Sequence, residues 1–227
     1  MARAIPHIHI EGDRVSVPAT TLRHSGFREW VKSSEFPEGV RATYASGQIF
    51  VEMSPEATET HNKVKTAVTA SLAQLVQSEQ LGEAYSDGTF FTHVGAAVST
   101  EPDFLFATWE SFESGRLRLI EKANRSDDYI ELEGTPDLVV EIVSDSSQKK
   151  DLVTLRDHYY AAGVPEYWII DARGDAVRFQ VFARTDQGYV SAREATEPQT
   201  SRVLGRTFRI ERARNRVGRW DYRLIAE

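Results

Sequence analysis

The sequence contains no cysteine. Disulfide bonds, cysteine-ligated zinc, iron–sulfur clusters and thiol catalysis are therefore excluded. No apolar run approaches the roughly 20 residues that a membrane-spanning helix needs. The segment Met1 to Asp13 also lacks the apolar stretch of a secretory signal. We therefore expect a cytoplasmic protein without a membrane partner.

Motifs of several common enzyme classes are also missing. There is no Gly-x-Ser-x-Gly nucleophile motif, no phosphate-binding loop and no dinucleotide-binding glycine fingerprint. The six histidines are scattered without the spacing of a zinc site. These absences argue against serine hydrolases, P-loop and dinucleotide-binding enzymes, and histidine-based zinc enzymes.

The composition is that of an ordinary globular protein, but its charge is uneven. Of 227 residues, 41% are hydrophobic and 27% are charged, so the chain can bury a substantial core. The formal net charge is −7, and a globally acidic protein is a poor non-specific binder of polyanions. Residues 201–227, however, hold eight arginines against three acidic residues, a balance of +5 that leaves −12 for the rest. This segment is either a solvated strand face paired with the acidic body or a patch that faces phosphate.

The apolar periodicity predicts an α/β protein. Two segments, 60–80 and 150–162, have apolar residues at helical spacing. Strand-like segments surround them, at residues 8–17, 41–53, 84–93, 100–107, 129–132, 138–143, 167–171, 177–183 and 188–194. From residue 60 onward, with the short strand at 129–132 set aside, the order helix, three strands, helix, strand favours helices packed on a mixed sheet. We expect one domain over 1–227, made of a β-rich extension over 1–40, a core over about 41–171 and a β-rich, arginine-containing extension over 172–227.

Two acidic residues interrupt strands that should be buried. Glu141 lies within the run Leu138 to Val143, whose near-continuous apolar character is typical of a strand buried on both faces. Asp137 lies on the same face as Glu141 but about 13 Å away along the strand. Asp103 leads another apolar strand. If these two strands are neighbours, Asp103 and Glu141 can converge on one hard cation such as Mg²⁺; otherwise they are strand-edge acids that cap loops or pair with arginine.

Three basic side chains could complete such a site. Lys149 and Lys150 follow the Glu141 strand, where an ammonium group could reach a metal-bound water or could simply be solvated. His61 lies near the start of the long helix and could hold a phosphate, orient a carboxylate or cap the helix. The residues alone leave these alternatives open.

Several stretches of the sequence together resemble a known family. They are Pro136 to Ser147 with Lys150-Asp151, Ala162 to Asp171, and, upstream in the same order, Gly47 to Pro55, His61-Asn62 and Glu101-Pro102-Asp103. This combination resembles the Uma-type restriction endonuclease family. That family was long carried as a domain of unknown function, and it belongs to the restriction-endonuclease-like PD-(D/E)xK superfamily.

The resemblance implies a restriction-endonuclease-like mixed sheet flanked by helices, with extra β-hairpins at both ends. It also implies that Asp103 and Glu141 are the metal-binding acids. The sequence departs from the superfamily pattern in its cation, because Val143 stands where the superfamily has lysine. Leu155 stands at the position to which the family's lysine is thought to have moved. Lys150 is then the best remaining cation.

Further positions around this site follow from the resemblance and the spacing. Lys149 is the second cation after Lys150. The family often has glutamate where Gln48 stands, which leaves Glu52 as the nearest acid. Glu52, His61, Asp137 and Lys149 are therefore expected to lie around the metal-binding residues.

The expected function is a Mg²⁺- or Mn²⁺-dependent endonuclease that hydrolyses phosphodiester bonds of DNA. Asp103, Glu141 and Lys150 are its predicted catalytic residues, DNA is its predicted partner, and a homodimer is its predicted assembly. One alternative is a catalytically inactive nucleic-acid-binding or regulatory module that keeps the fold. Another is a structural or oligomerisation protein in which the acids only order loops.

Overall fold

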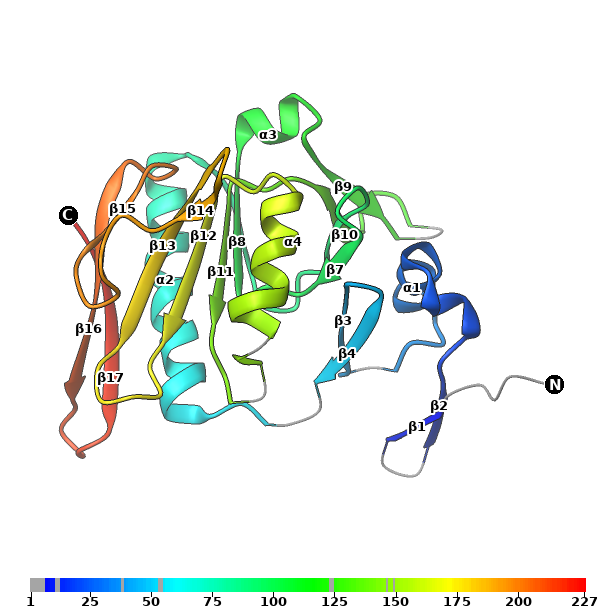
Figure 1. Ribbon diagram of the computed structural model, residues 1–227, viewed down its shortest axis with the longest axis horizontal. Coiled ribbons are helices and arrows are strands. Elements are labelled where there is room, and N and C mark those ends of the chain that lie inside the picture. The colour runs from blue at the N-terminus through cyan, green and yellow to red at the C-terminus, as the bar shows by residue number, and fades with distance from the viewer. Residues whose placement is uncertain are drawn as a thin grey trace.

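The structure, a computed structural model, describes residues 7–10, 13–37, 39–52, 55–122, 125–145, 147–148 and 150–227. Its architecture is mixed α/β, with two six-stranded sheets, a three-stranded sheet and a short N-terminal hairpin (Figure 1). The sequence predicted this class, and the observed sheets and helices confirm it.

The central sheet carries the core predicted from the sequence. Its strands, in spatial order, are β14 (Gly188–Val190), β13 (Arg178–Thr185), β12 (Glu166–Asp171), β11 (Leu138–Ile142), β8 (Phe104–Thr108) and β5 (Gly82–Ser86). β11 pairs in parallel with β12 and antiparallel with β8. All five residues of β11 are buried, so its apolar run does belong to a central strand covered on both faces.

Helix α2 (Lys63–Glu79) covers one face of this sheet. Its residues Val64, Val68, Leu72 and Val76 are buried against the even-numbered side chains of β8 and β11. The C-terminal sheet packs on the same apolar cluster; its strands are β15 (Gln199–Ser201), β16 (Arg206–Arg214) and β17 (Trp220–Ala226). A π-helical turn over Thr58–Asn62 precedes α2.

Helix α4 (Arg156–Ala161) covers the other face. It follows a second π-helical turn over Lys150–Leu155, and Leu155 and Tyr159 are fully buried against the odd-numbered side chains of β8 and β11. The second six-stranded sheet joins this cluster. In spatial order its strands are β4 (Gln48–Glu52), β3 (Arg41–Ala45), β7 (Val98–Thr100), β6 (Phe91–His93), β10 (Tyr129–Gly134) and β9 (Leu117–Glu121).

The remaining elements lie at the N-terminal side and between β8 and β9. β1 (His7–Ile10) and β2 (Asp13–Ser16) form the hairpin that the sequence predicted. A 3₁₀ turn (Ala19–Leu22) and α1 (His24–Val31) follow, so the segment expected to be β-rich also contains helix. Helix α3 (Trp109–Glu113) follows β8 directly.

Two details of the predicted order are different in the structure. Residues 84–93 do not form one strand: a turn at Asp87-Gly88 divides them between β5 and β6, which belong to different sheets. The segment predicted to be helical over 60–80 is α-helical only from Lys63 to Glu79. Helix α2 ends at Glu79, and Gln80 takes the left-handed conformation with φ 52°. Gly82 opens β5 so close to β8 that a Cβ atom there would lie 2.0 Å from the Ala107 carbonyl oxygen.

Asp137 lies at the N-terminal end of β11 and joins that strand to the start of α3. Its Oδ2 accepts hydrogen bonds from the Thr108 backbone N–H at 2.8 Å and from the Ser111 hydroxyl, and Arg116 forms an ion pair with Oδ1. Burial opposes ionisation of Asp137, but these donors outweigh it and lower its pKa. Asp137 is therefore an ionised, fold-stabilising carboxylate.

Replacing Asp137 should test this assignment. Asp137→Asn should lower the free energy of unfolding by about 2–4 kcal/mol at pH 7, because buried donors lose a charged acceptor. The folded pKa lies below the unfolded one, so this stability is present above about pH 4 and is lost as the pH falls. Urea unfolding between pH 3 and pH 7 measures both effects. An equal loss with the exposed Asp186→Asn would contradict the assignment.

Candidate functional site

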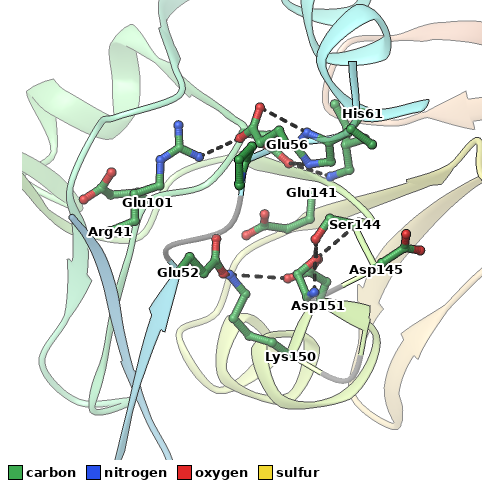
Figure 2. Close-up of a pocket in the computed structure, with 15 residues that line it drawn as sticks. Arg41, Glu52, Glu56, His61, Glu101, Glu141, Ser144, Asp145, Lys150 and Asp151 are labelled. Carbon is green, nitrogen blue, oxygen red and sulfur yellow. Dashed lines mark hydrogen bonds and ion pairs between the residues drawn. The ribbon is translucent and has the colours of Figure 1, made fainter. Parts of the chain in front are cut away.

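A cavity of about 240 Å³ lies at the C-terminal end of β11, where α2 and α4 begin. Figure 2 shows Glu141 pointing into its centre, between the Glu52–Lys150 pair on one side and Glu56 with His61 on the other. Most of its lining residues are polar or charged; the lining consists of Arg41, Glu52, Pro55, Glu56, Ala57, His61, Glu101, Asp103, Glu141, Ile142, Ser144, Asp145, Ser147, Lys150 and Asp151.

Asp103 and Glu141 enter this cavity from neighbouring strands. In the antiparallel pair of β8 and β11, Phe104 lies opposite Val140, so Asp103, one residue before β8, lies opposite Glu141. The Ile142 backbone N–H donates to Asp103 Oδ2 at 2.7 Å and continues this pairing. Both acids are buried, with 6% and 4% of their surfaces exposed. The structure thus brings them together on one face of the sheet.

The two carboxylates lie in surroundings that disfavour their ionised forms. Burial raises the pKa of Asp103, and His61 and Lys65 only partly offset this. The pKa of Glu141 is raised well above its usual range, first by burial and then by the charges of Asp151 and Asp103. The Tyr159 hydroxyl donates to Glu141 Oε1 at 2.6 Å. A bound cation would relieve this concentration of negative charge.

Lys150 reaches the same cavity from the π-helical turn that leads into α4. Its ammonium group forms an ion pair with Glu52, at the end of β4, and lies 3.8 Å from Asp151 Oδ1. Burial lowers the pKa of Lys150, but the charges of Asp151, Glu141 and Glu52 outweigh burial and raise it. Lys150 is therefore protonated, and the second sheet contributes Glu52 to the site.

Asp151 is a site residue to which the sequence analysis gave no role. It is 2% exposed; its Oδ2 accepts a hydrogen bond from the Ser147 hydroxyl. Its buried Oδ1 has no hydrogen-bond partner in the described part of the chain. Asp151, Leu155 and Tyr159 are spaced four residues apart, so they lie on the same face of the helical segment 150–162. An acidic residue on this otherwise apolar face was the sequence feature that could have identified Asp151 as a site residue.

A second polar group lies on the α2 side of the cavity. Glu56, His61 and Asp103 each offer a ligand atom, and these atoms lie within 4.8 Å of one another. Lys65 already supplies a positive charge there, since its Nζ lies 2.6 Å from Glu56 Oε1, 3.0 Å from Asp87 Oδ2 and 3.5 Å from Asp103 Oδ1. Glu56 and Lys65 therefore neutralise each other, and Asp103 is shared between this group and Glu141.

The remaining predicted positions have different outcomes. His61 and Glu52 line the cavity, as expected for residues around a site. Asp137 does not, because it lies at the opposite end of β11. Lys149 lies outside the described residues.

The donors present suit a hard divalent cation. Asp103 and Glu141 face each other across two strands, and carboxylate oxygens are the ligands that Mg²⁺ and Mn²⁺ prefer. The buried Oδ1 of Asp151 accepts no hydrogen bond among the described residues and lies 3.8 Å from Lys150 Nζ, so it adds a further carboxylate oxygen with free lone pairs. The three buried acids Asp103, Glu141 and Asp151 offer oxygen ligands beside Lys65 and Lys150, and these residues fit such an ion.

Comparison with known proteins places the chain in a family. The family model "Uma2: Putative restriction endonuclease" matches residues 27–213, which is most of the chain. The chain belongs to this family, which confirms the resemblance found in the sequence.

The fold has a counterpart among solved structures. A crystal structure from Anabaena variabilis, described as "a putative nuclease belonging to DUF820", is 20% identical and superposes with a TM-score of 0.52. The match covers 72% of this chain and 83% of that chain. At this identity the likeness concerns the fold, which is restriction-endonuclease-like. None of the curated proteins matches the chain. In the described part of the chain, no helix has the length and apolar content needed to span a bilayer.

Metal binding can be tested by stability. Millimolar Mg²⁺ or Mn²⁺ should stabilise the native protein by about 1–3 kcal/mol, a shift of a few degrees in Tm, because the ion binds only the folded site. Asp103→Asn and Glu141→Gln should abolish this shift, whereas Asp137→Asn should keep it. Differential scanning calorimetry of the four proteins, each with and without ion, gives the measurement. Equal shifts in all four would place the ion elsewhere.

Proposed function

We propose that the protein is a Mg²⁺-dependent endonuclease that hydrolyses phosphodiester bonds of DNA, with Mn²⁺ as an alternative ion. The observation that carries the proposal is the pairing of Asp103 and Glu141 in one cavity with the protonated Lys150. Membership of a family described as restriction endonucleases supports the same reaction class. A divalent cation held by acids beside a lysine is one arrangement that stabilises the charge developing in phosphodiester hydrolysis.

Each residue has a distinct part in this proposal. Asp103 and Glu141 hold the ion, which when bound supplies Lewis acidity toward a phosphate oxygen. The Tyr159 hydroxyl orients Glu141 by donating to Oε1, which leaves Oε2 for the ion. Lys150 Nζ donates to a non-bridging phosphate oxygen, where negative charge grows as water attacks. Glu52 holds that ammonium group at the cavity until substrate enters.

In this proposal, Lys150 supplies the positive charge that a lysine on a strand or helix supplies in the superfamily. Leu155, at the position of the displaced family lysine, is fully buried in the apolar cluster beside Tyr159 and cannot supply charge. Lys150 lies one helical turn earlier and reaches the cavity. Lys65, 3.5 Å from Asp103 Oδ1, is the second cation within reach.

One observation favours an alternative function. Glu52 already pairs with Lys150, so a chain that lacks the family lysine could keep the fold and bind nucleic acid without cutting it. Incubation of supercoiled and linear DNA with Mg²⁺ or Mn²⁺ separates the two, with Asp103→Asn as the control for contaminating nucleases. The cytoplasmic location and the homodimer remain predictions.

The role of Lys150 gives a specific kinetic expectation. Lys150→Ala should lower the cleavage rate about 10²–10³-fold, because a positioned charge at the transition state is lost. Leu155→Ala should act mainly through stability, with a loss of about 2–5 kcal/mol from the cavity it creates. Single-turnover rates, measured at a temperature where both variants are folded, provide the comparison.

The competing cation provides the control. If Lys150→Ala cleaves at the wild-type rate while Lys65→Met does not cleave, the charge comes from α2 and the assignment of Lys150 is wrong. If the wild-type protein cleaves no DNA with either ion, the nuclease proposal is wrong and the catalytically inactive nucleic-acid-binding module is the remaining function.

A further inference from the structure

The turn between β16 and β17 concentrates positive charge. Residues 212–220, here called the arginine hairpin, contain Arg212, Arg214, Arg216 and Arg219 and no acidic residue. Arg214, Arg216 and Arg219 are exposed. The surrounding protein is acidic, so this hairpin is a local exception to the charge of the whole chain.

The ion pairs of the C-terminal sheet divide its arginines into two groups. On the strands, Arg206 pairs with Glu79, and Arg209 and Arg223 pair with Glu211. These arginines follow the first interpretation of the segment, a strand face paired with acids. In contrast, none of the four hairpin arginines forms an ion pair in the part of the chain that the structure describes. Their charge remains available to an external anion.

Contacts within the hairpin fix its shape. The guanidinium carbon of Arg214 lies 3.3 Å from the centre of the Trp220 ring, and that of Arg212 lies 4.3 Å from it. Arg214 also donates to the Gly218 carbonyl at 2.9 Å. The Asn215 side chain accepts hydrogen bonds from two backbone N–H groups across the turn. A guanidinium that is already positioned loses less freedom when it binds phosphate.

One side of the hairpin is attached to the helix that borders the cavity. The Trp220 backbone N–H donates to Glu59 Oε2 at 2.8 Å, and Lys63 Nζ donates to the Trp220 carbonyl at 2.6 Å. Glu59 and Lys63 flank His61, which lines the cavity. Figure 1 shows the turn between β16 and β17 at the same end of the molecule as the start of α2.

The other side is attached to the turn that follows β12. Arg212 donates to the carbonyls of Gly174, at 2.9 Å, and of Asp175. In that turn, Arg173 donates to the Asp145 side chain at 3.1 Å, and Asp145 lines the cavity. The hairpin is therefore held beside the cavity from two directions.

We propose that the arginine hairpin binds the phosphodiester backbone of the DNA next to the bond in the cavity. The identity of this ligand rests on the proposed nuclease function. The acidic cavity repels a polyanion, so the substrate needs a positive surface close by, and the unpaired guanidinium groups of Arg214, Arg216 and Arg219 supply it. The contacts are to phosphate, so the hairpin adds affinity without reading sequence.

Duplex binding tests the hairpin separately from cleavage. The full chain is titrated with a fluorescent 30-base-pair duplex in EDTA, across a series of salt concentrations. The variant Arg216→Gln/Arg219→Gln removes two charges but keeps the Arg214–Trp220 contact. The matched control, Arg23→Gln/Arg202→Gln, removes two exposed arginines that do not line the cavity.

The hairpin variant should bind the duplex roughly tenfold more weakly, and the slope of log K against log salt should fall by about 2, one for each lost phosphate contact. The control should bind as the wild type does. Equal affinities and slopes for both variants would overturn the proposal. So would a wild-type protein that binds phosphatidylserine vesicles but no duplex. If the hairpin variant loses binding while the wild type never cleaves DNA, the nuclease function fails and the hairpin assignment stands.

Discussion

The register between β8 and β11 is the constraint on which the site depends. Side chains alternate between the two faces of a strand, so after a slip of one residue Asp103 and Glu141 would no longer lie opposite each other. The pairs Leu138–Phe106 and Val140–Phe104 fill the α2 face with apolar side chains and fix that register. The apolar core thereby keeps Asp103 and Glu141 opposite each other on neighbouring strands, although burial raises the pKa of both.

Positive groups reach these acids from both faces of the sheet. Lys65 comes from α2 and Lys150 comes from the turn before α4. A lysine near the start of a helix therefore lies on each side of the central sheet. Both helix starts are π-helical, a conformation that is common at functional sites. The second sheet closes the cavity through Glu52 and Arg41. The central sheet, the starts of the two covering helices and the second six-stranded sheet are therefore all needed to assemble the site. The site lies where the ends of these elements meet.

The sequence predicted the core better than it predicted the surroundings of the site. Periodicity identified α2, α4 and β11, because each has a long apolar pattern that only one type of element satisfies. The alternation of side chains along a strand placed Asp137 and Glu141 on one face, whereas the pairing of Asp103 with Glu141 followed from the resemblance to the family. Alternation gives the face but not the partners at each end of a strand, so the hydrogen bonds from Thr108 and Ser111 to Asp137 could not be foreseen. The placement of the Glu56, Lys65 and Asp151 side chains in the site depends on how the π-helical turns orient the chain. The spacing of residues in the sequence does not specify this orientation.

The central claim is that one divalent ion binds between Asp103 and Glu141. Anomalous diffraction from crystals of the full chain soaked in Mn²⁺ tests it most directly. We expect a single strong peak about 2.1 Å from a carboxylate oxygen of each acid. A peak held by Glu56 and His61 without Glu141, or none in this cavity at saturating Mn²⁺, would contradict it.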